Sequence, residues 1–291
     1  MGIRDLGYKR YEGALLPHRS RYRVLIRRAL SLAWASGLTK TTIILGMFPP
    51  VICGVYIFLK HQAMQQEVVQ YLAHRAQVQL DDPGSLVFTC IYWCQIWFAF
   101  VLSLLVAAPA ISEDVRTGAF QFYFARPVAR SHYLVGKVAP AAILVAIVTL
   151  APALLLALLR VGLAQSGEEA WRSTSWLVGT LAYGPIYALV LTLPAVALSS
   201  LGRRSGSLQG LWAVGFFLSW LLGEGVAAGA DLPYVALLSI PTDLRLVGQL
   251  LYGIEPAYDL PWYLPSLVLA GLVVGSAYVL VRRLGRVEVF S

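Results

Sequence analysis

Long apolar runs separated by short polar segments dominate the pattern of the chain. A helix needs about 17–25 apolar residues to cross the hydrocarbon core of a membrane, because each residue adds about 1.5 Å. Six runs reach that length, and none alternates in polarity as the strands of a β-barrel would. They cover residues 41–59, 86–111, 138–159, 176–198, 208–228 and 262–281. The pattern therefore predicts an all-α membrane protein with six transmembrane helices.

Composition supports this fold class. The chain has 291 residues, of which 58% are hydrophobic and 13% charged, whereas soluble domains carry about 25% charged residues. Glu224 is the only charged residue in the six runs. It follows Leu208 by about 24 Å of helix, so we expect an interfacial carboxylate near the outer surface. The alternative is an ion site of a coupled carrier.

The distribution of basic residues predicts the orientation. Residues 1–40, 112–137, 199–207 and 282–291 hold eighteen of the 23 Lys and Arg residues. Basic loops favour the cytoplasmic side, and no secretory signal is visible. We therefore expect a cytoplasmic arm, a six-span domain over 41–281 and a cytoplasmic tail. This explains the net charge of +8 better than nucleic-acid binding, since the basic residues flank spans.

Residues 20–35 predict an amphipathic helix that does not cross the membrane. Its apolar stripe is bordered by Arg23, Arg27 and Arg28, which is typical of a helix lying among lipid headgroups. Packing on another protein surface is the alternative. Before the last span, loop 229–261 is apolar but broken by prolines, which favours short re-entrant outer helices.

The loop at 112–137 is far longer than a connection between two spans requires. Ser112 can cap a helix whose first turn contains Glu113 and Asp114, where acids oppose the helix dipole. Pro127 would end that helix, so we predict a helix over 113–126. Exposed aromatic clusters usually mark a protein contact, and the alternative is an elbow packed only on its own bundle. The aromatic residues of this stretch include Phe120, Phe122 and Phe124.

The order of motifs in this loop resembles a known family. Glu113-Asp114, Gly118, Arg126-Pro127, Arg130 and Gly136-Lys137 lead directly into an apolar span. This order is similar to the loop between the second and third spans of type-2 ATP-binding-cassette (ABC) permeases. The amphipathic N-terminal helix, the six spans and the broken outer segment extend the resemblance over most of the chain. Ala119 departs from it, because the family usually has threonine after the glycine.

The resemblance implies an exporter-type permease that forms a homodimer or pairs with a related permease. Two ABC ATPase subunits would drive it, with residues 113–126 as the coupling helix. The partner would bind ATP and Mg, because this chain lacks a phosphate-cradling loop: Gly136-Lys137 continues with Val138. The residues expected at the ATPase contact are Glu113, Asp114, Gly118, Phe120, Phe122, Phe124, Arg126, Pro127, Arg130 and Lys137.

Other function classes predict features that the sequence lacks or leaves open. We expect no catalytic, cofactor or metal site, since the histidines lie outside the spans and no H-E-x-x-H or G-x-S-x-G is present. A permease-like dimer could transmit ATPase motion to an extracytoplasmic partner without moving a substrate. An ion-coupled secondary transporter is a further alternative.

Some polar and small residues within the spans have two interpretations. Candidates for lining a transport path, or for ordinary helix–helix hydrogen bonds, are Tyr92, Gln95, Tyr183, Tyr187 and Thr192. The small residues at 271–275 favour close helix packing, either inside the chain or at a dimer contact, and we favour the former. Arginine outnumbers lysine nineteen to four, which favours a GC-rich bacterial genome and hence the bacterial inner membrane.

Overall fold

The computed structural model describes residues 21–64, 87–119, 129–227, 229 and 232–285. This part of the chain is helical and contains no strand. Six of its helices are long and apolar enough to cross a membrane, which confirms the predicted number and order of spans. They are Gly37–Ala63, Val87–Thr117, Arg130–Gly162, Gly167–Ser199, Ser205–Ala227 and Tyr263–Gly285.

Most of these helices continue beyond the apolar runs into their polar flanks. α8 (Arg130–Gly162) and α9 (Gly167–Ser199) form an antiparallel pair with the most extensive contact in the fold. The Ser166 hydroxyl accepts a hydrogen bond from the Glu169 amide at 3.2 Å and so caps the start of α9. A strong local cap and a short turn explain why the second helix of the pair begins where it does.

The second span is irregular in a way that its apolar pattern does not predict. α5 (Ile96–Leu102) lies between two π-helical segments, Cys90–Gln95 and Ser103–Ala107. A π segment loosens the regular ladder of backbone hydrogen bonds. α10 (Ser205–Trp220) compensates for this, because Gln209 donates a hydrogen bond to the Leu104 carbonyl at 3.0 Å.

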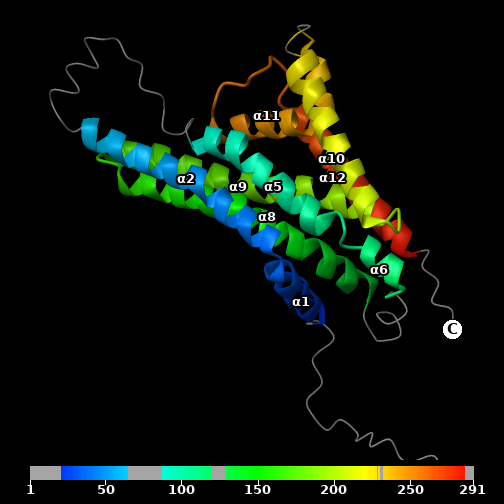
Figure 1. Ribbon diagram of the computed structural model, residues 1–291. Helices are drawn as coiled ribbons and strands as arrows, with labels where there is room; N and C mark the ends of the chain where they lie inside the picture. The colour runs from blue at the N-terminus through cyan, green and yellow to red at the C-terminus, as the bar shows by residue number, and fades with distance from the viewer. Residues whose placement is uncertain (1–20, 65–86, 120–128, 228, 230–231, 286–291) are drawn as a thin grey trace, which may run out of the picture.

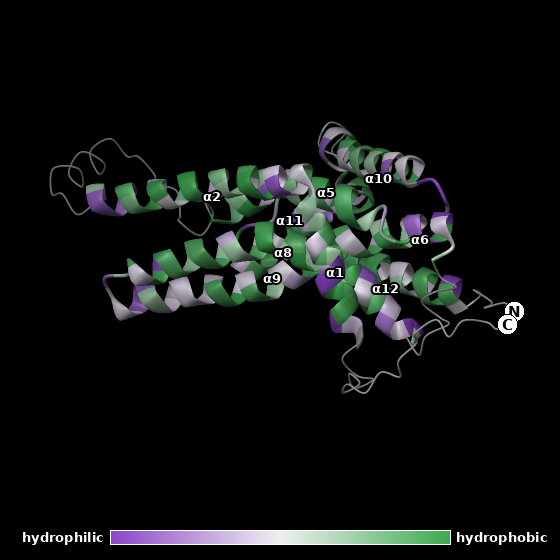
Figure 2. Ribbon diagram, turned by 60° about the horizontal axis from the view of Figure 1, so that its bottom comes forward, coloured by the Kyte–Doolittle hydropathy of each residue, from purple (hydrophilic) through white to green (hydrophobic). Residues whose placement is uncertain are grey.

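The short helices α1 (Arg21–Ala35), α6 (Ser112–Thr117) and α11 (Ile240–Tyr252) lie at the two ends of the bundle (Figure 1). α1, α6 and the end of α12 (Tyr263–Gly285) lie towards one end, with the start of α8. α11 and the end of α2 (Gly37–Met64) lie towards the other. Figure 2 shows that the long helices are mainly hydrophobic along their length, as contact with lipid requires.

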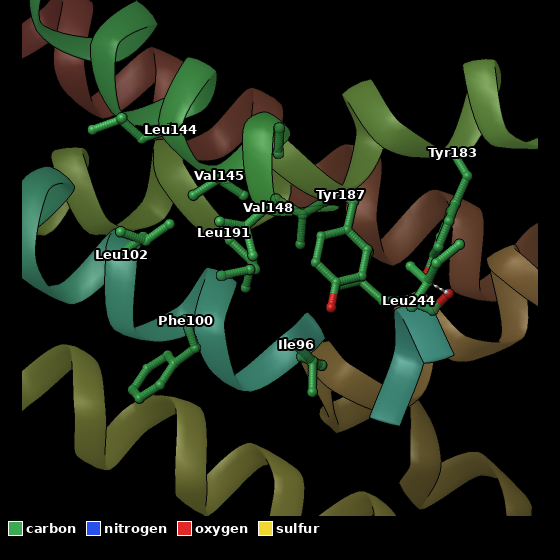
Figure 3. Packing of buried hydrophobic residues seen from close by; sticks show 14 of the residues in the cluster. Ile96, Phe100, Leu102, Leu144, Val145, Val148, Tyr183, Tyr187, Leu191 and Leu244 are labelled. Carbon is green, nitrogen blue, oxygen red and sulfur yellow. Dashed lines mark hydrogen bonds between the residues drawn. The ribbon is translucent and has the colours of Figure 1, made fainter. Parts of the chain in front are cut away.

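The core of the bundle lies where α5, α8 and α9 meet (Figure 3). Leu144 and Val148 of α8 pack with Leu191 of α9, and all three are at most 2% exposed. Phe100 of α5 stacks on Phe216 of α10 with ring centroids 4.2 Å apart. These contacts bury the central helices on most sides and leave α2, α10 and α12 at the periphery, where most of their apolar residues face outward.

The small residues of α12 do not pack inside the described part of the chain. A side chain built at Gly271 or Gly275 would meet no atom within 4 Å. Nearby Val274 and Tyr278 are 66% and 62% exposed. The preferred interpretation of this segment as internal packing is therefore wrong, and its small-residue face is open.

Candidate functional site

The candidate site is an elbow at one end of the bundle, which we define as residues 108–119 and 129–137. The chain turns at 108–111 and enters α6. The amides of Ile111 and Ser112 donate hydrogen bonds to the Ser199 hydroxyl at 2.9 and 3.0 Å. The cap of α6 thus comes from the end of α9, whereas the sequence predicted Ser112 itself as the cap.

α6 is shorter than the predicted helix over 113–126. It ends at Thr117 because Gly118 adopts a left-handed conformation with φ of 68°. The Ala119 amide then donates to the Asp114 carbonyl at 3.0 Å and closes the helix end. The predicted length is wrong, since a left-handed residue interrupts the helix. The remaining candidates of this stretch lie outside the described residues: Phe120, Phe122, Phe124, Arg126 and Pro127.

Asp114 points into the protein. It is 7% exposed, accepts a hydrogen bond from the Tyr133 hydroxyl at 2.6 Å and lies 2.6 Å from Lys137 Nζ. The Lys137 ammonium is also 5.6 Å from the centre of the Tyr133 ring. Both partners belong to α8, so this one carboxylate fastens α6 to the third span.

Glu113, in contrast to Asp114, faces outward. Its side chain is 50% exposed and pairs with Arg116 one turn along the helix. Ion pairs of this kind contribute little to stability, because water screens them. The two neighbouring acids therefore have different surroundings: Asp114 is an internal anchor, while Glu113 and Arg116 form a charged outer surface of α6.

The Gly-Lys pair at the start of α8 serves two contacts at once. A β-carbon on Gly136 would lie 2.7 Å from Leu25 Cβ, so the absence of a side chain lets α1 approach α8 closely. Its neighbour Lys137 holds α6 through Asp114. Glycine and lysine at these adjacent positions thus place both α1 and α6 against the same helix.

Arg130 connects a further helix to the elbow. Its guanidinium donates a hydrogen bond to the Gly285 carbonyl at the end of α12, at 3.2 Å. Arg23, Arg27 and Arg28 lie on the exposed side of α1, and none of their guanidinium groups has a charged or hydrogen-bonding partner among the described residues. The motif residues within the described part thus join α1, α6, α8 and α12.

A second polar cluster lies at the α11 end of the bundle. Glu224, in the π-helical segment Leu221–Ala227, accepts a hydrogen bond from Tyr92 at 3.0 Å and lies 3.5 Å from Arg245. The Arg245 guanidinium also lies 5.6 Å from the Tyr92 ring and 5.7 Å from that of Trp93. Sequence reasoning placed Glu224 near this end but missed Arg245, whose only signal is an arginine in an apolar outer segment.

α11 is embedded among the spans. Tyr183 of α9 donates to the Leu244 carbonyl at 2.9 Å (Figure 3), and the hydroxyls of Thr180 and Tyr252 lie 2.7 Å apart. Asp243 of the same helix is 1% exposed, and neither carboxylate oxygen has a partner among the described residues. Burial raises the pKa of Asp243 to about 8.

The five candidates for a transport path all lie inside the chain. None of them is more than 2% exposed. Gln95 donates to the Gly46 carbonyl at 2.8 Å and Thr192 to the Ala188 carbonyl at 2.7 Å. The Tyr187 hydroxyl has no partner within the described part, and the space beside it holds only about 10 Å³, roughly one water. The remaining two, Tyr92 and Tyr183, make the bonds given above.

Comparison with known proteins adds no further identification. No family model matches the chain, and no curated protein matches it. The features that bear on function are therefore those of the chain itself: six apolar helices, the asymmetry of basic residues and the elbow that joins α1, α6, α8, α9 and α12.

Proposed function

We propose that this chain is the membrane subunit of an ABC transporter of the exporter type. It would act as a homodimer or with a related permease, in a bacterial inner membrane, driven by two separate ATPase subunits. ATP and Mg would bind to those subunits and not to this chain. The observation that carries the proposal is the elbow, in which α6 is anchored by Asp114 and exposes Glu113 and Arg116.

The elbow suits the transmission of force from a partner. A helix that receives a push must be joined firmly to the elements that it moves. α6 meets this requirement, because Ser199 fixes its start to α9 while Tyr133 and Lys137 hold its middle on α8. Movement of α6 would therefore be passed to the third and fourth spans, which form the most closely packed pair in the bundle.

Two roles follow for the motif residues. We assign the partner contact to Glu113 and Arg116 on α6 and to the aromatic stretch at 120–127. Asp114, Gly118, Arg130 and Lys137 would hold and shape the surface that the partner meets. This division follows from burial, since Asp114 is 7% exposed and both of its partners are internal, whereas Glu113 and Arg116 face outward.

The orientation of the proposed subunit follows from charge. Eighteen of the 23 basic residues fall in sequence segments that the predicted topology assigns to the same side as the elbow, which would make this side cytoplasmic and the elbow accessible to an ATPase. α1 would lie in the headgroup layer beside it. α11 would be a re-entrant helix of the outer side, and its Leu244 carbonyl and Tyr252 hydroxyl are hydrogen-bonded to α9.

A transport route would run between two copies of the chain. The five polar candidates are engaged or enclosed within one chain, so they are poorly placed to contact a moving substrate. The peripheral helices α2, α10 and α12 instead offer the open apolar faces that a second copy could cover.

Site-specific cross-linking tests the proposal. Arg116→Cys should cross-link to the ATPase encoded beside this reading frame when both are expressed together. Gln165→Cys is the matched control, because it is an exposed position at the opposite end of the bundle. Cross-linking of Arg116→Cys but not Gln165→Cys supports the proposal. Equal cross-linking of both positions, or of neither, contradicts it.

A further inference from the structure

A groove of about 540 Å³ runs between α1 and the spans beside it. Its apolar wall combines Leu25 and Leu32 of α1 with Val106 and Pro109 of the second span and Pro140 of α8. A volume of this size is typical of a ligand pocket, for which about 300–1,000 Å³ is usual. The groove is therefore large enough to hold part of an amphiphilic molecule.

The groove has an apolar part and a charged part. Val106, Pro109 and Pro140 belong to helices long and apolar enough to cross a membrane, and Val106 and Pro109 are partly exposed. Leu32 of α1 is 57% exposed although it lines the groove. Such an apolar wall next to a bilayer favours an acyl chain as its occupant, because the chain loses contact with water there.

The charged residues that line the groove balance, with Glu113 and Asp114 against Arg28 and Lys137. Its two acids have cationic partners, since Asp114 pairs with Lys137 and Glu113 with Arg116. Arg28 also lines the groove, and its guanidinium has no ion pair or side-chain hydrogen bond within the described part of the chain. The uncompensated charge at this place is thus one guanidinium, whose planar group of donors suits a phosphate.

The surrounding helix strengthens the same preference. α1 contains no acidic residue, and Arg23 and Arg27 are exposed beside Arg28. In a bilayer these arginines raise the local concentration of anionic lipid, whereas Arg28 is the one that lines the groove. A free anion would gain the charge contact but not the burial of a chain against the apolar wall.

We propose that the groove binds one anionic phospholipid, with an acyl chain along the apolar wall and the phosphate at Arg28. The lipid would join α1 to the elbow, because the same groove is lined by Gly136 of α8 and by both acids of α6. The proposal needs only that α1 lies at the membrane surface. It is independent of the ATPase, so a failure of cross-linking to that partner leaves it unchanged.

Native mass spectrometry of the full chain, released from detergent after titration with lipid, tests this site. Phosphatidylglycerol should remain bound as a single copy per chain. Phosphatidylcholine with the same acyl chains should bind at least about fivefold more weakly. Arg28→Gln should weaken retention of phosphatidylglycerol by about fivefold, the share expected of one arginine near anionic lipid. Arg27→Gln is the control, because Arg27 is adjacent but does not line the groove; it should change retention less than twofold.

A second variant tests the position of the chain. Ala29 lines the groove, so Ala29→Trp should fill part of it and lower retention of the lipid. Equal losses in the Arg28 and Arg27 variants would show unspecific attraction and overturn the proposal. Equal binding of both lipids, or binding of glycerol phosphate as tight as that of the lipid, would also overturn it. Displacement of the lipid by a protein partner would assign the groove to that partner instead.

Discussion

Asp114→Ala should destabilise the chain, whereas Glu113→Ala should not. Asp114 is buried with two partners on α8, and the substitution removes one buried acceptor from both the Tyr133 hydroxyl and the Lys137 ammonium. Breaking a buried ion pair by removing one partner costs about 3–5 kcal/mol. The Lys137 side chain remains 20% exposed, so water can recover part of this energy. We therefore expect about 3 kcal/mol, the lower end of that range.

This difference is large enough to measure by thermal unfolding in detergent. At about 2–4 °C per kcal/mol, the Asp114→Ala midpoint should fall by roughly 6–12 °C. Asp114→Asn keeps an acceptor for Tyr133 but loses the charge beside Lys137. Its unfolding midpoint should therefore lie between those of the wild type and Asp114→Ala. Glu113→Ala should unfold with the wild type, because its pair with Arg116 is exposed to water on both sides.

Variants of the two acids also separate the anchoring of α6 from the binding of a partner. Glu113→Ala combined with Arg116→Ala should keep the fold and the dimer but reduce recovery of the ATPase in a pull-down. Asp114→Ala should affect both, because the helix that carries the surface is no longer fixed. If Asp114→Ala unfolds at the wild-type temperature, the anchor contributes nothing and the reasoning about the elbow is refuted.

Three further predictions concern other parts of the molecule. The pKa of Asp243 is raised to about 8 from an ordinary 3.8, so the folded state binds more protons than the unfolded state between these two pH values. Thermal stability should therefore fall as the pH rises from about 4 to 8. Asp243→Asn should lack this decline, and an equal decline in the variant would contradict the prediction. Gly136→Leu should displace α1, because even a β-carbon at this position would lie 2.7 Å from Leu25 Cβ. Protease cleavage within α1 should then increase, whereas the control Gly271→Leu, on the open face of α12, should leave it unchanged. An impermeant thiol reagent added to intact cells should label Gln165→Cys but not Ser205→Cys, and labelling of the latter would overturn the topology.

The spans and α1 could be predicted because their information is local. An apolar run of sufficient length specifies a membrane helix, and an arginine-bordered stripe specifies an amphipathic one, whatever the rest of the chain does. The helices of the structure accordingly include nearly all of each predicted run. Their ends were less predictable, as α8 shows by beginning well before its apolar run at Arg130.

The elbow could be predicted as a turn between two helices but not in its construction. Its N-terminal cap comes from Ser199, which is distant in sequence, and a local pattern cannot reveal that partner. The neighbouring acids Glu113 and Asp114 looked equivalent because only the fold decides which of them is buried. Gly118 was recognised as part of the motif, but its left-handed conformation, which ends α6 early, was not.

The outer segment before the last span shows the same limit. Its prolines and apolar character indicated short helices, and α11 is one of them. Nothing local showed that Arg245 would reach Glu224 or that Tyr252 would meet Thr180. These contacts depend on how α11 packs between spans that are far away in sequence.

The mass of the complex isolated from native membranes tests the central claim most directly. The chain should be purified in a mild detergent without added partner, and its assembly measured by native mass spectrometry. We predict two permease chains, either two copies of this 31.8 kDa chain or one copy with a related permease, together with two copies of an ATPase subunit that carries a phosphate-binding loop. A complex that contains no such subunit, or ATP hydrolysis by the purified chain alone, would contradict the proposal.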